Sequence, residues 1–167
     1  MPKVYFASDH AGFALRQALV EAARTLGYEV EDMGAHTLDP EDDYPDFITP
    51  CAQKVAEENP RGSAARVFGI ILGGSGQGEA MCANRVPGAR AAVFYGPMRV
   101  ATSLDIEGGR SEDGFDLVRL SRRHNDANIL SIGARFVSGK EAAEAMQIFL
   151  ETAFSDAPRH ARRIAKF

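Results

Sequence analysis

The sequence predicts an α/β domain of the doubly wound kind, built around a parallel sheet. Three observations support this prediction. Five short runs of strand-forming residues are separated by segments with helical periodicity, the chain of 167 residues has about the length of one domain, and 45% of its residues are hydrophobic. This hydrophobic content is enough to form a buried core. Strands that alternate with helices favour a parallel sheet with helices on both faces.

The first two predicted strands and their helices lie in the amino-terminal third of the chain. Residues 4–8 form a short β-type run, and apolar residues then recur at helical spacing over residues 13–23. Residues 28–33 form the second predicted strand, which a polar loop follows. Asp43 is a good N-cap residue and Pro45 fits a first-turn position, so a helix is predicted to open here.

Three further strands are predicted at residues 66–72, 91–95 and 128–132, separated by helix-compatible sequence. Residues 140–154 predict another helix, and a short basic segment follows it. One segment does not fit this alternation, because residues 105–114 are polar, glycine-rich and acidic. We predict that it is a mobile surface loop.

The charge balance argues against several classes of partner. With 19 basic and 23 acidic residues, the net charge of −4 provides no basic footprint for nucleic acid or an anionic membrane. No secretory signal is apparent, and no stretch reaches the roughly 20 apolar residues of a membrane span. A cytoplasmic protein is therefore expected. Cys51 and Cys82 fall in predicted helices and are expected to be reduced, since one pair makes neither a disulfide framework nor a zinc site.

The most informative stretch is residues 69–80, where a buried-strand pattern runs into four glycines and then a helix. In open α/β sheets such a turn lies at the carboxyl ends of the strands, where ligands bind. Successive backbone N–H groups in such a turn can converge on an anion or a developing oxyanion. A purely structural strand-to-helix turn is the alternative interpretation of these glycines.

Three common glycine-rich sites are not matched. No Lys-Ser or Lys-Thr pair follows the glycines, as a phosphate-binding P-loop requires. A nucleophile elbow centred on Ser75 would need glycine in place of Gln77. The first strand ends in Asp-His-Ala-Gly at residues 9–12, which is not the fingerprint of a dinucleotide site.

Seven motifs occur in order along almost the whole chain. They are SDHAG at residues 8–12, DYP at 43–45, GGSGQGE at 73–79, ANRVPG at 83–88, HNDAN at 124–128, GAR at 133–135 and RHARRI at 159–164. Together they resemble the family of ribose-5-phosphate isomerase B and the galactose-6-phosphate isomerase subunits. The resemblance implies a Rossmann-like three-layer αβα sandwich with a five-stranded parallel sheet. It also implies an aldose-ketose isomerase that uses no metal and no other cofactor.

The same resemblance bears on domain organisation and partners. A single sugar-phosphate isomerase domain is expected to span residues 1–167, and the segment around residues 105–115 looks like a surface insertion relative to the family. The expected partners are a small sugar phosphate and a second copy of the chain. The resemblance implies a homodimer, or a tetramer made of two dimers, with active sites shared between subunits.

Glu79 is the predicted carbon-acid base. Many members of the family place a cysteine base where this chain has Gly73, whereas one branch carries a glutamate just after the glycine turn, as here. Moving a proton between adjacent carbons requires a base, and a carboxylate with a reference pKa of about 4.3 is already ionised at neutral pH. The alternative is that Glu79 only complements the dipole at a helix start.

Other residues match sugar-binding positions of the family. His124 matches the histidine that opens the sugar ring, and a group that titrates near neutrality suits that task. By the same resemblance Asn125 is expected to hydrogen-bond substrate oxygens and Asp9 to contact sugar hydroxyls, while Tyr44 is a further candidate for contact with the sugar. The predicted donors to the developing oxyanion are backbone groups of the turn and the Ser75 hydroxyl. The turn residues concerned are Gly74, Ser75, Gly76, Gln77 and Gly78.

The phosphate group is expected to contact His10 and three arginines. Arg159 and Arg163 are four residues apart, so they project from one face of a helix, where two guanidinium groups can hold a phosphate bidentately. The resemblance adds Arg135 and His10 to this set. A solvated basic helix face is the alternative interpretation of the arginine pair.

The leading hypothesis is the interconversion of ribose 5-phosphate and ribulose 5-phosphate by ring opening and proton transfer through an enediolate. Phosphates of galactose, allose or erythrulose are the nearest alternative substrates. A hypothesis of another class is a non-catalytic module that binds a sugar phosphate or a nucleotide, because a fold does not fix a function.

Overall fold

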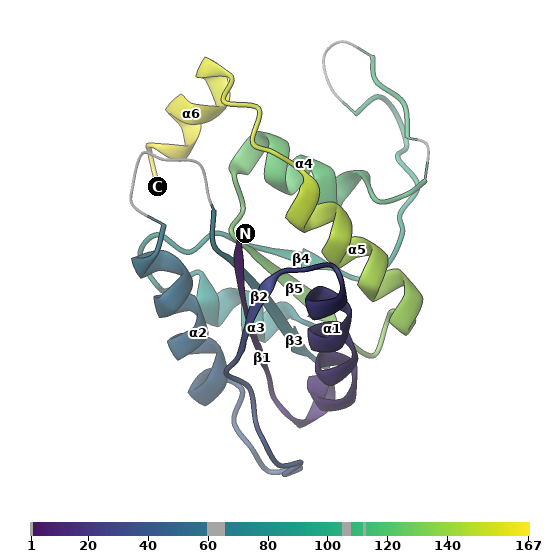
Figure 1. The fold of residues 1–167 in the computed structure, drawn as a ribbon. Coiled ribbons are helices and arrows are strands. Elements are labelled where there is room, and N and C mark those ends of the chain that lie inside the picture. The colour runs from purple at the N-terminus through teal and green to yellow at the C-terminus, as the bar shows by residue number, and fades with distance from the viewer. Residues whose placement is uncertain (1, 60–65, 105–107, 112) are drawn as a thin grey trace.

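The structure is a computed structural model that describes residues 2–59, 66–104, 108–111 and 113–167. Five parallel strands form one sheet in the order β2-β1-β3-β5-β4, with helices on both of its faces (Figure 1). The strands are β1 (Lys3–Ser8), β2 (Glu29–Asp32), β3 (Phe68–Gly73), β4 (Ala91–Phe94) and β5 (Ile129–Gly133). All five predicted strands are confirmed, and so is the predicted three-layer α/β architecture.

Two hydrophobic cores lie on the two faces of the sheet. The first packs α1 (Phe13–Thr25), α4 (Asp116–Asn125) and α5 (Gly139–Glu151) against one face. The second packs α2 (Pro45–Glu57) and α3 (Gln77–Ala83) against the other. Because successive side chains of a strand point to opposite faces, neighbouring strand residues serve different cores. This two-sided burial explains why the sequence of β3 is apolar throughout.

The predicted N-cap at Asp43 is wrong. Helix α2 begins at Pro45 with Tyr44 as the N-cap residue, and no side chain of the described residues caps it. Tyr44 already has helical backbone angles, with φ −52° and ψ −34°. The N–H groups of Asp46 and Phe47 therefore bond to the backbone carbonyls of Asp43 and Tyr44 rather than to a side chain. Pro45 does occupy the predicted first-turn position.

Two short helical segments complete the fold. The 3₁₀ helix η1 (His10–Gly12) follows β1 directly, and α6 (Pro158–Ile164) packs against α4 near the carboxyl terminus. Cys51 and Cys82 lie in α2 and α3, as predicted, and both are free thiols. Among the described residues, none of the helices is both long and apolar enough to cross a membrane.

The predicted loop at residues 105–114 is only partly described. Residues 105–107 and 112 lie outside the described part of the chain, so its predicted mobility stays a prediction. At the base of this segment the backbone N–H of Met98 donates to the carbonyl of Gly114, at 2.9 Å.

The strand order places a topological switch point between β1 and β3. From β1 the chain crosses to β2 on one side and then to β3 on the other. Ser8 pairs with Leu72, and Gly73 pairs with Gly133 of β5, so three strands end close together at one edge. This carboxyl edge is where open α/β sheets bind ligands.

Candidate active site

Glu79 lies at this carboxyl edge, in the first turn of α3, and its carboxylate fills the space beside Gly73. The residue is 4% exposed. A Cβ built on Gly73 would lie only 1.7 Å from Oε1 of Glu79, so no side chain fits at residue 73 while the carboxylate is in this position. The structure therefore places the predicted base at the end of β3.

Burial raises the pKa of the Glu79 carboxyl above its ordinary value, and the negative charge of Asp9 acts in the same direction. Asp9 is itself buried at the end of β1, where it caps η1. Its Oδ1 accepts from the backbone N–H groups of Ala11, at 2.9 Å, and Gly12, at 3.3 Å. A carboxylate of raised pKa is a stronger base once it has lost its proton, which suits abstraction of a carbon-bound proton.

Two more predicted residues lie against the glycine turn. A Cβ built on Gly78 would lie 2.9 Å from the Tyr44 hydroxyl, so this hydroxyl lies over the first turn of α3. A Cβ built on Gly74 would lie 3.3 Å from Cζ of Arg135, which places the guanidinium group beside the turn. Phenol and guanidinium donors thus lie close to the backbone of the turn.

The turn itself is held by a buried hydrogen bond that the sequence did not indicate. Gly76 has a φ of +72°, a left-handed conformation that glycine adopts without strain. Its carbonyl accepts from the Ser131 hydroxyl of β5 at 2.7 Å. The Ser75 hydroxyl accepts from the backbone N–H of Gln77 at 3.3 Å. Ser131 therefore fixes the turn from the neighbouring strand.

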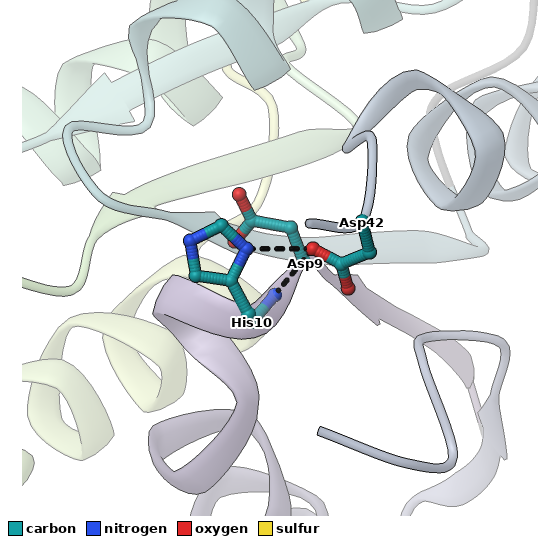
Figure 2. A group of neighbouring side chains, drawn as sticks. All are labelled: Asp9, His10 and Asp42. Atoms are coloured by element: carbon teal, nitrogen blue, oxygen red, sulfur yellow. Dashed lines mark hydrogen bonds and ion pairs between the residues drawn. The ribbon is translucent and has the colours of Figure 1, made fainter. Parts of the chain in front are cut away.

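His10 is bound to Asp42, a residue that the sequence analysis did not select (Figure 2). Oδ1 of Asp42 lies 2.6 Å from Nδ1 of His10 and accepts from the His10 backbone N–H at 3.1 Å. The hydrogen bond with Asp42 raises the pKa of His10 above its ordinary value. The acidic run at residues 41–43, just before Tyr44, was the available sign of such a partner.

Asp9, His10 and Asp42 each offer one potential metal-ligand atom, and these atoms lie within 4.8 Å of one another. Asp42 and His10 already bond to each other, and Asp9 already caps η1. These bonds already account for the positions of the three side chains, so we assign no metal to this cluster.

The remaining predicted residues lie at the opposite edge of the sheet. His124 and Asn125 end α4, just before β5 begins, and Arg159 and Arg163 lie on α6, which packs against α4. Glu79, by contrast, follows the carboxyl end of β3. The length of β5, about 13 Å at roughly 3.3 Å per residue step, separates the two edges. Within one chain the structure does not bring these four residues to Glu79.

His160 joins this second group, although no sequence motif assigned it a role. Its ring lies 4.2 Å, centroid to centroid, from that of His124. Nε of Arg159 donates to Nε2 of His160 at 3.1 Å, and Nδ1 of His160 lies 3.0 Å from the Ser155 hydroxyl. Because a guanidinium nitrogen only donates, Nε2 must be unprotonated and Nδ1 carries the proton. Burial and the nearby charges of His124, Arg159 and Arg163 lower the pKa of His160, in agreement with this neutral form.

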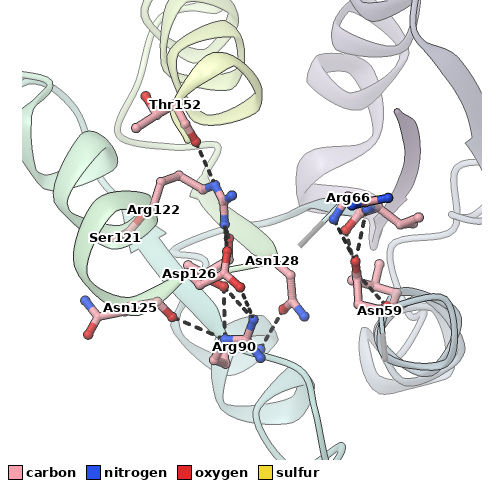
Figure 3. Close-up of polar contacts among 12 residues, drawn as sticks. Asn59, Arg66, Arg90, Ser121, Arg122, Asn125, Asp126, Asn128 and Thr152 are labelled. Atoms are coloured by element: carbon pink, nitrogen blue, oxygen red, sulfur yellow. Dashed lines mark hydrogen bonds and ion pairs between the residues drawn. The ribbon is translucent and has the colours of Figure 1, made fainter. Parts of the chain in front are cut away.

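A buried ion-pair network holds the end of α4 (Figure 3). Asp126, in a left-handed conformation with φ 43°, accepts from Arg122 at 2.8 Å and from Arg90 at 3.0 Å. Arg90 also donates to the backbone carbonyl of Asn125 at 3.2 Å. The network fixes where the helix stops, and therefore where His124 and Asn125 lie.

Comparison with known proteins identifies the family. The Ribose/Galactose Isomerase family matches residues 4–106 and 114–167. The chain belongs to the ribose/galactose isomerase family. Residues 107–113 fall between the two ranges that match, inside the segment predicted as an insertion.

Relatives in this family match nearly the whole chain. Ribose-5-phosphate isomerase B of Mycobacterium tuberculosis is 37% identical over 162 residues, covering 97% of this chain and 85% of that protein. The protein of the same name from Mycolicibacterium paratuberculosis is 36% identical over 162 residues, covering 97% and 87%.

Solved structures of the same family share the fold. The crystal structure of ribose-5-phosphate isomerase B from Mycoplasma genitalium with bound ribulose-5-phosphate has a TM-score of 0.81 and 32% identity, and covers 98% of this chain and 92% of that one. The type B ribose 5-phosphate isomerase of Trypanosoma cruzi has a TM-score of 0.80 and 33% identity, with 99% and 94% covered.

Proposed function

We propose that this protein interconverts ribose 5-phosphate and ribulose 5-phosphate, with Glu79 as the base that moves the proton between carbons. The observation that carries the proposal is the position of the buried Glu79 carboxylate at the switch point of the sheet, over Gly73 and close to Asp9. The names of the family relatives support the substrate, as does the Mycoplasma genitalium structure with bound ribulose-5-phosphate.

The reaction requires one carbon-bound proton to move. In the open-chain aldose, Glu79 takes the proton from carbon 2, and the electron pair of that C–H bond forms a double bond between carbons 1 and 2. Negative charge develops on oxygen 1, where backbone N–H groups of the glycine turn are the proposed donors. Oxygen 1 then gains a proton, oxygen 2 loses one, and Glu79 returns its proton to carbon 1. The ketose results, and the carboxylate is regenerated.

The rest of this half of the site is proposed to hold the substrate. His10 and Arg135 carry the charges that suit the phosphate end, and Asp9 and Tyr44 offer hydrogen-bonding groups to the sugar. All four lie at the carboxyl edge with Glu79. A phosphate between an imidazolium and a guanidinium gains charge-assisted hydrogen bonds.

The second half of the site is proposed to come from another copy of the chain. His124, Asn125, Arg159 and Arg163 lie at the opposite edge of the sheet, too far from Glu79 to share one substrate within a chain. A two-fold symmetric dimer resolves this separation, because each copy can present one edge to the other edge of its partner.

Exposed apolar side chains near the glycine turn support such an interface. Met81 of α3 is 68% exposed and Phe136, just after β5, is 62% exposed. Phe136 packs edge-to-face on the half-exposed Tyr95, with ring centroids 6.1 Å apart. Large apolar side chains that gather on one surface are typical of protein contacts. We propose a homodimer as the smallest active unit.

The domain organisation and location stay predictions. We propose one isomerase domain over residues 1–167, with the insertion around residues 105–115 at its surface. The gap in the family match at residues 107–113 supports the position of this insertion. A cytoplasmic location stays a prediction of the sequence.

The decisive experiment is solvent deuterium exchange at carbons 1 and 2 of the sugar, combined with turnover of a panel of phosphorylated pentoses, hexoses and tetroses. We expect ribose 5-phosphate to have the highest kcat/KM, because that ratio measures discrimination in the transition state. Faster turnover of a hexose or tetrose phosphate would replace the proposed substrate. A protein that binds sugar phosphate without exchange of deuterium is a binding module.

A further inference from the structure

The feature that carries a further inference is the double contact between Asp42 and His10. The loop between β2 and α2 places the Asp42 carboxylate over the start of η1 (Figure 2). One oxygen, Oδ1, accepts from the His10 backbone N–H at 3.1 Å and lies 2.6 Å from Nδ1 of the same residue. The Asp42 side chain is only 8% exposed, so water screens this contact weakly.

The two contacts together fix the direction of the imidazole ring. One contact anchors the backbone of His10 and the other anchors Nδ1, so the ring has little freedom to rotate. Nε2, the other ring nitrogen, has no hydrogen bond among the described residues, and the His10 side chain is partly exposed. The ring thus keeps one nitrogen available for a ligand at the carboxyl edge.

The protonation state follows from the charged groups around the ring. Asp42 and Asp9 raise the pKa of His10, whereas partial burial and Arg135 lower it, and the Asp42 hydrogen bond is the largest of these effects. With Asp42 accepting from Nδ1–H, a protonated ring presents a second N–H, at Nε2, as a charged donor. Such a donor is suited to an anion.

We propose that Asp42 is a positioning residue, which holds His10 as an imidazolium whose Nε2–H is directed at the phosphate group of the substrate. This inference rests on the proposed function, because the phosphate is that of the sugar. It assigns a role to a residue that does not itself contact the substrate.

A second observation separates this role from simple loop packing. Oδ2 of Asp42 is buried and has no hydrogen-bond partner among the described residues. A buried acceptor without a partner is destabilising, so a purely structural role would favour a smaller or neutral residue here. The unpartnered oxygen is explained if the site needs the negative charge beside His10.

The test separates charge from geometry with two variants. Asp42→Asn keeps an oxygen that can accept both hydrogen bonds but removes the charge, and Asp42→Ala removes both. The nearby Glu41→Gln is the matched control, because Glu41 is an exposed acid of the same loop. Thermal melting followed by circular dichroism establishes that each variant is folded.

The first readout is the titration of His10 by NMR in ¹³C- and ¹⁵N-labelled protein, with the His10 signal assigned from a His10→Gln variant. We expect the midpoint of His10 to fall in Asp42→Asn and Asp42→Ala and to stay unchanged in Glu41→Gln. This readout needs no substrate. An unchanged midpoint in Asp42→Asn, or an equal shift in Glu41→Gln, would overturn the proposal.

The second readout is the pH dependence of KM for ribose 5-phosphate. In the variant, His10 becomes neutral at a lower pH, so we expect KM to rise at least about fivefold at pH 8 and much less at pH 6, with kcat changed less than about twofold. In a His10→Gln background, Asp42→Asn should have no further effect on KM. A fall in kcat at constant KM, or full additivity of the two substitutions, would contradict the positioning role.

A third probe separates failure of this inference from failure of the proposed function. Inorganic phosphate, titrated without any sugar, should perturb the His10 signal at lower concentration in the wild type than in Asp42→Asn. If no sugar phosphate is turned over but this difference is found, the Asp42 role stands and the isomerase assignment fails. If a sugar phosphate is turned over but wild type and Asp42→Asn respond to inorganic phosphate alike, the isomerase assignment stands and the Asp42 role fails.

Discussion

The carboxylate of Glu79 occupies the space in which a side chain on Gly73 would begin. A Cβ built on residue 73 would lie 1.7 Å from Oε1 and 2.1 Å from Cδ of Glu79. The two positions therefore compete for one volume at the end of β3. A base can reach this volume from the strand, through a side chain on residue 73, or from the helix, through residue 79, but not from both at once. In this chain the helix supplies it.

Replacing Glu79 by glutamine tests the base directly. Glu79→Gln keeps the shape of the side chain but cannot accept a proton at neutral pH, so kcat should fall at least about 100-fold.

The same variant tests the pKa of Glu79. This pKa is raised in the folded protein, so the wild type loses stability as pH rises through that value. Chemical denaturation should therefore find the variant as stable as the wild type or more stable at pH 8, with the difference vanishing below about pH 4.

The exposed Glu144 of α5 provides the control for that experiment, since Glu144→Gln removes a carboxylate that lies outside the site. Its kcat should match the wild type. Near wild-type turnover in Glu79→Gln would remove Glu79 from the mechanism.

Adding one methyl group at residue 73 tests the shared volume. Gly73→Ala would place Cβ against the Glu79 carboxylate, which is the far end of a flexible side chain, so the carboxylate should move at modest cost in stability. A displaced base should lower kcat at least about tenfold, since small misplacements of a catalytic group are costly. Gly139→Ala is the matched control, because no atom of the described part of the chain lies within 4 Å of a Cβ at Gly139. Equal activity of the two variants would show that residue 73 does not restrict Glu79.

Mixing two inactive variants tests whether the site is shared. A heterodimer of Glu79→Gln with His124→Asn contains one site with both native residues only if Glu79 and His124 come from different copies. Random pairing of equal amounts would then restore about one quarter of wild-type activity, because half of the dimers would have one working site of two. Co-expression with two affinity tags allows the heterodimer to be purified and assayed. A purified heterodimer as inactive as its parents would contradict a site in which Glu79 and His124 come from different copies.

His160 provides a prediction about pH. Its pKa is lowered in the folded protein, so its contribution to stability is present above the unfolded value of about 6.5 and is lost as pH falls below it. His160→Gln should therefore lose less stability than the wild type between pH 7.5 and pH 5, as measured by urea denaturation at the two values. The shifted pKa of His10 also makes stability depend on pH, but it does so equally in both proteins and cancels in the comparison.

The same residue should influence binding through Arg159. His160→Ala removes the acceptor of the Arg159 Nε–H, at 3.1 Å, so KM for ribose 5-phosphate should rise about tenfold. His160→Gln retains an acceptor and should show a smaller rise. Equal KM values for the two variants and the wild type would mean that His160 does not position Arg159.

Local patterns in the sequence predicted the elements of this fold well. The apolar run that became β3 and the spacing that places Arg159 and Arg163 on one helix face are properties of neighbouring residues. The predicted cap at Asp43 was wrong because Tyr44 already has helical backbone angles. The residue types around Tyr44 do not by themselves specify these backbone angles.

Contacts between distant segments could not be predicted in the same way. Asp42 meets His10, 32 residues away, only because the loop after β2 turns back over η1. His160 meets His124 only because α6 packs on α4. The family resemblance gathered His124 and Glu79 into one list of candidates, but the strand order puts them at opposite edges of the sheet. The resemblance already implied a site shared between subunits, whereas the edge of the sheet at which each residue lies required the topology.

The division of the candidate residues between two edges has a consequence for how activity depends on the amount of protein. If each copy holds only half of a site, a dissociated chain is inactive, and only the dimer catalyses the reaction. Well below the dissociation constant, the rate should fall with the square of chain concentration rather than in proportion to it. Substrate that contacts both halves of the site would favour association of the two copies. Activity should therefore be retained on dilution with substrate present and lost on the same dilution without it.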